Sequence, residues 1–354
     1  MKRFSLLIQN EFKSFLTAPV VHLIAILQPT LMYLLMSVIM VVPTFEMRVV
    51  NPFSELGNKF SAAVDEVKSP IGPDYIELIP VDDPSPEFRQ VIEITEIDGN
   101  PTALQTYGYI DSNLVKNLRN RLTAALLVLW NIELGDQGIT IHEHPWLPND
   151  IPYTVYFGMA MIPLAAYLSA AMIGGYLMAQ EFENGTILTY RLSPTSFLLI
   201  LTAKLTRLMI TALTGAGILY LSLGLITGVW ASSFLTVLLI LVPLILIASC
   251  IGLAAGLLTR STLPSFLIAL ASAFAFWLIG SGFGLAAGFS TIFEKISRLT
   301  PNTPVIEMMF PYFYFGRQVA AHPLAAKLQL IGYSLAMLFM LMFIYLKQVL
   351  SKDR

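Results

Sequence analysis

The order of apolar and polar positions divides the chain into six long apolar runs and one long polar segment. A helix rises about 1.5 Å per residue, so about 20 apolar residues cross a bilayer core of about 30 Å. Each apolar run meets this length, and Pro29 is tolerated inside the first one. The pattern predicts six transmembrane helices, at Val20–Val42, Tyr153–Ala179, Phe197–Gly228, Phe234–Leu258, Pro264–Ala287 and Leu324–Leu346.

The residues that precede the first run repeat apolar side chains at helical spacing. Phe4, Ile8, Phe12 and Phe15 fall on one face, between polar residues. This is the stripe of an amphipathic helix, and such a helix lies in the membrane interface. We expect an interfacial helix over residues 1–18, followed by the first span over 19–44. The alternative is that these residues extend the first span toward the N-terminus.

Residues 45–150 are polar and rich in proline, glycine and acidic side chains. Strand-like patterns occur at Tyr75–Val81, Gln90–Ile97, Gln105–Ile110 and Ile139–His142. Leucines at helical spacing predict one helix over Asn113–Trp130. The segment therefore predicts a small α+β domain inserted between the first two spans.

Composition supports the assignment to a membrane. Hydrophobic residues make up 56% of the 354 positions and charged residues only 12%, with a mean hydropathy of +0.70. Soluble domains carry about 25% charged residues. The net charge of −2 does not favour nucleic acid as a partner, and the one cysteine, Cys250, excludes an intrachain disulfide.

The distribution of charge predicts the orientation. Residues 45–150 hold 17 acidic and 7 basic side chains, a formal charge of −10, whereas the rest of the chain holds 6 and 14, or +8. Cations in short loops mark the cytoplasmic side, and long domains contribute little to this rule. The cations that define this side are Lys2, Arg3, Lys13, Arg191, Lys204, Arg207, Arg260, Lys347, Lys352 and Arg354. We therefore expect a multi-pass protein of the cell (inner) membrane. Both termini should be cytoplasmic, and residues 45–150 should be extracytoplasmic.

A short charged segment separates the second apolar run from the third. It reads Gln180-Glu181-Phe182-Glu183-Asn184-Gly185-Thr186 and continues through Arg191 and Pro194. Polar residues here are costly unless the segment leaves the membrane. We interpret 180–197 as a cytoplasmic helix or loop that another protein contacts; the alternative is a loop that serves topology alone. Lys204 and Arg207 follow, and we expect their side chains to reach toward water.

Small residues recur at four-residue spacing within the apolar runs. Gly280, Gly284 and Gly288 are in register beside Trp277, and similar pairs occur at Gly224/Gly228 and Gly252/Gly256. Such faces let helices approach closely, although small residues are also common in spans without this role. Residues 289–323 contain four prolines and an aromatic cluster, which predicts a re-entrant or interfacial segment.

Several chemistries are disfavoured by the sequence. The chain contains no Gly-x4-Gly-Lys-Ser/Thr phosphate-binding loop, so we expect no ATP site of its own. His142 and His144 supply two imidazoles without a visible third ligand, so we expect no metal site. Gly280-Ser281-Gly282 lacks the frame of a hydrolase nucleophile elbow, and His22 is interpreted as structural. The spans hold almost no ionisable residues, which disfavours a proton-coupled carrier.

The charged segment resembles that of a known family, the membrane subunits of type-2 ATP-binding-cassette exporters. Members carry an acidic Gly-Thr segment after the second span, then a Ser/Thr-Pro, then a lysine that enters the third span. The matching residues here are Glu181-Phe182-Glu183-Asn184-Gly185-Thr186, Ser193-Pro194-Thr195 and Lys204. The stretch Trp146–Asn149 and the succession of six spans are also similar. Phe182 departs from the pattern, because a basic residue is usual there.

The resemblance implies an export permease and not an enzyme. Two six-span subunits, identical or related, would form the pathway in surrounding membrane lipid. Two cytoplasmic ATPase subunits would carry ATP and magnesium, and this chain would bind no cofactor. The residues implied to couple to the ATPase are Glu181, Glu183, Gly185, Thr186, Arg191, Pro194 and Lys204.

Two other functions remain open from the sequence. One is a membrane-anchored sensor or scaffold whose external domain binds a ligand; the other is a lipid-modifying membrane enzyme. The apolar spans suit a hydrophobic or amphipathic cargo, such as a drug or lipid, and suit surrounding lipid equally. They therefore do not identify a cargo.

Overall fold

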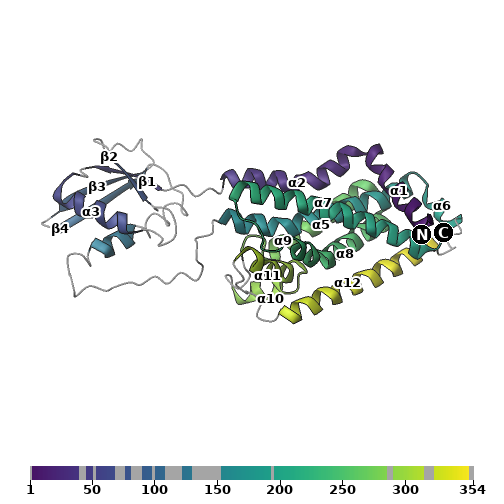
Figure 1. Ribbon diagram of the computed structural model, residues 1–354. Coiled ribbons are helices and arrows are strands. Elements are labelled where there is room, and N and C mark those ends of the chain that lie inside the picture. The colour runs from purple at the N-terminus through teal and green to yellow at the C-terminus, as the bar shows by residue number, and fades with distance from the viewer. Residues whose placement is uncertain are drawn as a thin grey trace. The chain divides into compact units, whose positions relative to one another are not determined.

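The computed structural model describes residues 2–39, 45–50, 53–67, 76–80, 90–97, 100–107, 122–129, 153–192, 195–284, 290–314 and 323–350. The chain forms two compact units (Figure 1). The first unit combines Met1–Val41 with Ile151–Arg354, and the second is Val42–Asp150.

Within the described residues, six helices are long and apolar enough to cross a membrane, and all belong to the first unit. They are α2 (Pro19–Ile39), α5 (Tyr153–Glu183), α7 (Phe197–Thr227), α8 (Phe234–Thr259), α9 (Thr262–Ile279) and α12 (Pro323–Tyr345). The prediction of a multi-pass membrane protein with six spanning helices is confirmed. The most apolar stretch of α5 is entirely buried, whereas most of α9 and α12 is not. The helix α5 is therefore the centre around which the others pack.

Two glycines let α8 approach the backbone of α5. A Cβ atom built on Gly252 would lie 2.2 Å from the Ala171 carbonyl oxygen, and one on Gly256 would lie 2.7 Å from the Gly175 carbonyl oxygen. Real Cβ atoms do not come this close, so only glycine fits at these positions. The spacing of four residues places both glycines on the face of α8 that meets α5.

The fifth span is shorter than the sequence predicts. Instead of continuing to Ala287, α9 ends at Ile279, and Ser281 has a left-handed backbone with φ 71°. Tyr156 on α5 donates a hydrogen bond of 2.7 Å to the Ser281 carbonyl, and Asn302 donates one of 2.8 Å to the Gly280 carbonyl. These side chains satisfy backbone carbonyls that a longer helix would have used itself.

The expected helical face is consequently wrong for Gly280 and Gly284. Gly280 is the residue that ends α9, and Gly284 lies in the bend beyond it. Gly288 lies outside the described residues. Gly280 is still closely packed, because its Cβ would lie 2.7 Å from the Asn302 Cβ. The close approach is to the start of α11, not to another membrane-crossing helix.

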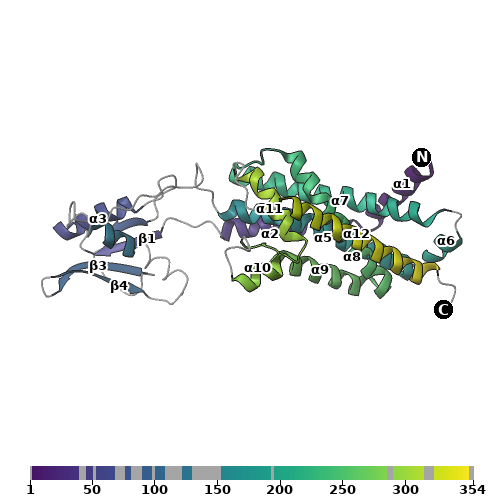
Figure 2. The same cartoon turned by 90° about the horizontal axis from the view of Figure 1, so that it is seen from below.

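The described part of residues 289–323 forms two short helices, α10 (Thr291–Ser297) and α11 (Asn302–Phe313). Neither is long enough to span a membrane. Most side chains of α11 are buried, because this helix packs against α5, α8 and α12. In both views α10 and α11 lie at the end of the bundle opposite to the start of α1 (Figures 1 and 2).

The N-terminal residues form their own helix, α1 (Lys2–Thr17), which is separate from α2 and packs against α7. The apolar residues Phe4, Ile8, Phe12 and Phe15 are all partly exposed. Another short helix, α6 (Ile187–Leu192), follows α5. In both views α6 lies at the same end of the bundle as the start of α1 and the end of α12 (Figures 1 and 2).

The second unit contains a four-stranded sheet in the order β2-β1-β3-β4. The strands are β1 (Phe45–Val50), β2 (Ile76–Pro80), β3 (Gln90–Ile97) and β4 (Asn100–Tyr107). Strand β1 is parallel to β2 and β3, whereas β3 and β4 form an antiparallel pair. Helix α3 (Glu55–Glu66) is capped by Ser54, whose Oγ accepts a 2.9 Å hydrogen bond from the Gly57 amide.

The sequence pattern anticipated part of this unit. The predicted Gln90–Ile97 strand has the bounds of β3, and Tyr75–Val81 exceeds β2 by one residue at each end. The predicted Gln105–Ile110 strand overlaps only the last residues of β4. Residues 122–129 are helical, within the predicted Asn113–Trp130, and Ile139–His142 lies outside the described residues. Strand β1 and helix α3 were not predicted, because β1 directly follows the apolar run of the first span and α3 has only a narrow apolar face.

Candidate functional site

A group of charged and polar side chains is buried where four helices meet. This charge cluster consists of Glu11 on α1, His22 on α2, Glu181 on α5, and Lys204 and Arg207 on α7. Lys204 and Arg207 are only 2% and 1% exposed. Charges this deeply buried are retained only when they are paired.

Glu11 connects the two cations of α7. Its Oε1 atom lies 2.9 Å from Lys204 Nζ, and its Oε2 atom lies 3.5 Å from Arg207 Nη1. Lys204 also forms an ion pair with Glu181. Two carboxylates thus face two cations, and the cluster is formally neutral if His22 is neutral. Removing one partner from such a buried group leaves an uncompensated charge, which costs about 3–5 kcal/mol.

The contacts of His22 fix its neutral form. Its Nδ1 atom lies 2.9 Å from the Ala18 carbonyl oxygen, so this nitrogen carries the proton and donates it. Its Nε2 atom then has a free lone pair, which accepts a 2.6 Å hydrogen bond from Arg207 Nη2. The imidazole therefore serves as an acceptor that holds the guanidinium. Phe12 adds its ring face, with its centroid 5.8 Å from the Arg207 guanidinium carbon.

The two residues that follow Glu181 point to a different part of the molecule. The Glu183 carboxylate accepts hydrogen bonds from the Thr262 amide at 2.7 Å and from the Thr262 hydroxyl at 3.1 Å. It thereby caps the start of α9, where the N-cap residue Ser261 makes no capping bond of its own. The ring of Phe182 lies under the Arg260 guanidinium at 5.4 Å. The end of α5 therefore contacts α7 through Glu181, and it contacts the α8–α9 turn through Phe182 and Glu183.

Residues 184–192 form a turn followed by α6. Gly185 has φ 68°, a left-handed conformation that favours glycine, and no atom lies within 4 Å of a Cβ built there. The Thr186 hydroxyl donates a 3.3 Å hydrogen bond to the Glu181 carbonyl. On α6, Ile187 is buried, whereas Leu188 and Leu192 are 55% and 86% exposed. The short helix thus presents two leucines, one turn apart, that the described residues do not cover.

The structure brings together only some of the residues that the resemblance implies for coupling. Glu181 and Lys204 are direct partners. Glu183 ends α5 and its side chain caps α9 instead, and Gly185 and Thr186 belong to the turn that follows. Arg191 belongs to α6, but its side chain is not described, and Pro194 lies outside the described residues.

The expectation that Lys204 and Arg207 reach toward water is wrong. Both are enclosed by the bundle, because Glu11 and His22 supply partners from helices that are distant in sequence.

Sequence reasoning did not select Glu11, and it gave His22 no partner. A signal for Glu11 was present, because it is the one acidic residue of α1 and lies on the apolar face, three residues after Ile8 and four before Phe15. A carboxylate on a face that packs against other helices is stable only when a cation is buried beside it. His22 carries no comparable local signal, since its partner Arg207 is 185 residues away.

The charge cluster links four helices through their side chains. Within the described part of the chain, no group of three or more His, Cys, Asp or Glu side chains is placed to hold a metal ion. Cys250 is buried. The cluster instead joins α1, α2, α5 and α7, so a displacement of any one of these helices changes the contacts of the others.

In comparisons with known proteins, no family model matches the chain. No curated protein is significantly similar to it in sequence.

Proposed function

We propose that this chain is the permease subunit of an ATP-binding-cassette exporter, driven by separate cytoplasmic ATPase subunits. The observation that carries this proposal is the position of α6. This exposed helix connects α5 to α7 along the chain. Both α5 and α7 contribute side chains to the buried charge cluster. A partner that binds and displaces α6 would therefore move α5 and α7 and, through Glu11, also α1.

The exposed leucines of α6 suit a docking surface. Leu188 and Leu192 lie one helical turn apart, so they form a small apolar face. We assign this face to the ATPase subunit. The termini and α6 would then be cytoplasmic, which agrees with the cations of the short loops. The segment 45–150, with its four-stranded sheet, would be the extracytoplasmic α+β domain.

In this mechanism the chain converts a movement of its partner into a rearrangement of the bundle. ATP binding would draw two ATPase subunits together and pull α6 with them. A ligand shifts such an equilibrium only by its different affinity for the two states. The buried ion pairs make the end of α5, the start of α7 and α1 move as one body, because separating them would leave charges unpaired. A second permease subunit, identical or related, would complete the pathway.

The experiment is purification of the tagged chain from its native membrane in mild detergent, followed by an ATPase assay and identification of bound proteins. We expect a stoichiometric nucleotide-binding subunit and ATP hydrolysis. The double variant Leu188→Asp/Leu192→Asp is expected to lose that subunit. The matched control is Leu126→Asp/Leu127→Asp, two leucines of the 45–150 segment that are each 44% exposed, and it should retain the subunit.

Two results would contradict the proposal. The wild-type chain could purify without any nucleotide-binding subunit, or the α6 variant could retain it as well as the control does. The first result would favour the sensor or scaffold function. The second would place the docking surface elsewhere on the molecule.

A further inference from the structure

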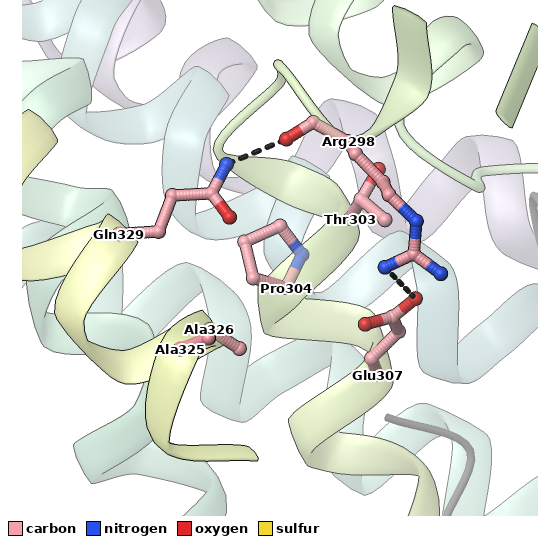
Figure 3. A pocket seen from close by; sticks show the side chains of 7 residues that line it. All are labelled: Arg298, Thr303, Pro304, Glu307, Ala325, Ala326 and Gln329. Carbon is pink, nitrogen blue, oxygen red and sulfur yellow. Dashed lines mark hydrogen bonds and ion pairs between the residues drawn. The ribbon is translucent and has the colours of Figure 1, made fainter. Parts of the chain in front are cut away.

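A cavity of about 320 Å³ lies between α10, α11 and α12 (Figure 3). This is the size of a small ligand pocket. The described residues that line it are Arg298, Thr303, Pro304, Glu307, Ala325, Ala326 and Gln329. The cavity lies at the opposite end of the bundle from α6, so it is separate from the charge cluster (Figure 1).

Glu307 carries a buried carboxylate whose negative charge is only partly compensated by a nearby cation. The residue is 8% exposed, and the cation that contacts it among the described residues is Arg298, at 3.6 Å between Nη1 and Oε1. Arg298 makes its shorter contacts with Glu294, at 2.8 Å from Nη2 and 3.2 Å from Nε. Among the described residues no hydrogen-bond donor reaches the Glu307 carboxylate. Glu294 and Glu307 share Arg298, so these three described side chains have a formal charge of −1, which favours a cation.

Gln329 offers a second oxygen to the same cavity. Its amide nitrogen donates to the Arg298 carbonyl at 2.5 Å and to the Tyr333 hydroxyl at 3.1 Å, and these two bonds fix the orientation of the amide. Figure 3 shows the amide oxygen on the side of Pro304, away from the Arg298 carbonyl. It also shows one Glu307 oxygen directed at Arg298 and the other turned away from it. Two oxygen acceptors thus border one cavity with an apolar wall of Pro304 and alanines.

The donors that match these acceptors are those of a primary ammonium group. Such a group carries a positive charge and three N–H donors. A quaternary ammonium has no N–H donor, and it is usually bound by a cage of aromatic rings. The described lining of the cavity contains no aromatic residue. The cavity therefore suits ethanolamine-type chemistry better than choline-type chemistry.

The surroundings indicate an amphiphile. The helix α12 is one of the six spanning helices, and the cavity lies against its first two turns. Apolar side chains on the adjoining segments are exposed: Ile296 at 47%, Leu299 at 71% and Leu328 at 60%. Acyl chains can cover such side chains while a polar head group enters the cavity.

We propose that this cavity binds the primary ammonium group of an aminophospholipid, with Glu307 as its counter-ion and the Gln329 amide oxygen as a second acceptor. The bound ammonium neutralises the excess negative charge that Glu294 and Glu307 leave beside Arg298. This site is independent of the transport function proposed above, because it involves neither α6 nor the charge cluster.

The test compares two lipids with the same acyl chains on the purified full-length chain in detergent. One has an ethanolamine head group and the other a choline head group, and their affinities are measured by native mass spectrometry and by the shift in Tm. We expect the ethanolamine lipid to bind about tenfold more tightly, as for one good charged contact. The variant Glu307→Gln should lose this preference. The control Glu55→Gln removes an exposed carboxylate of the second unit and should keep the preference for the ethanolamine lipid.

Two further arms keep the test decisive. The variant Gln329→Leu retains the charge of Glu307 but removes an acceptor, and we expect it to reduce the preference severalfold even if Glu307→Gln does not fold. Soluble glycerophosphoethanolamine is expected to bind far more weakly than the lipid. Equal affinity of the wild type for both lipids, or a preference that survives in both cavity variants, would overturn the proposal. Equal affinity for the soluble compound and the lipid would overturn the assignment to a lipid.

Discussion

Glu11 in α1 and Lys204 in α7 form a buried ion pair, with Oε1 and Nζ 2.9 Å apart although 193 positions separate them in the chain. The pair fixes the amphipathic N-terminal helix to the third spanning helix. Because Glu11 also contacts Arg207, the position of α1 depends on both cations of α7. An isolated amphipathic helix would bind the membrane surface through its apolar face alone. Here its position is set by charge.

Removal of the Lys204 charge should strongly destabilise the first unit. In Lys204→Met, Glu11 and Glu181 remain buried without their shared cation, and we expect a loss of about 3–5 kcal/mol. Glu11→Gln combined with Lys204→Met should cost less than the sum of the two single variants, by at least about 1 kcal/mol. Unfolding measured by denaturant or by Tm in mild detergent checks this.

The control for this comparison of single and double variants is Lys13→Met, which removes an exposed cation from α1. It should change stability by less than about 0.5 kcal/mol. Additive effects of Glu11→Gln and Lys204→Met would contradict the direct coupling of the two residues.

The cap that Glu183 provides for α9 predicts a smaller and local effect. Glu183→Ala removes the acceptor of the Thr262 amide and hydroxyl, at an expected cost of about 1 kcal/mol. Because this site is exposed to water, the freed amide can be hydrated. Hydrogen exchange should show faster exchange at the Thr262 amide and little change at the buried cluster. Equal losses of stability in Glu183→Ala and Glu181→Ala would contradict a local cap at Glu183 and a buried ion pair at Glu181.

The contact between α8 and α5 predicts a contrast between two glycines. Gly252→Ala places a methyl group 2.2 Å from the Ala171 carbonyl, and overpacking of this kind costs about 1–3 kcal/mol. Gly217→Ala adds the same methyl group to α7, where nothing lies within 4 Å of it. That change should be neutral or should stabilise by up to about 1 kcal/mol through helix propensity. The Tm of the two variants distinguishes these outcomes, and similar values would contradict the packing.

Glu307 predicts a dependence of stability on pH. Burial raises the pKa of its carboxyl above the ordinary value of 4.5, Glu294 raises it further, and Arg298 lowers it. Tyr156 on α5 also lies near it. Because the folded state holds the proton more tightly than the unfolded state, this residue favours folding increasingly as pH falls from above the raised pKa toward 4.5.

The Tm of the lipid-free wild type, minus that of Glu307→Gln, should therefore rise as pH is lowered through this window. Ethanolamine lipid should reduce the dependence, because a bound ammonium stabilises the ionised form. A difference in Tm that stays constant with pH would show that Glu307 has an ordinary pKa.

The sequence alone determined the six spanning helices, because an apolar run of sufficient length is favoured to cross a bilayer whatever its neighbours are. It also located strands β3 and β2, whose side chains follow a local pattern. It singled out Glu181 and Lys204, since charges are conspicuous beside apolar runs. These are properties of neighbouring positions in the chain, and local patterns report them directly.

Only the tertiary structure decided which charges are paired and where a helix ends. Glu11 and His22 became part of the cluster because α1 and α2 pack against α7, and nothing within either helix specifies a partner nearly 200 residues away. The fifth span ends at Ile279 because Tyr156 and Asn302, on other helices, bind the carbonyls that follow it. The energies of burial and hydrogen bonding depend on which groups meet in space, and the hydrophobic pattern of a single segment does not contain that information.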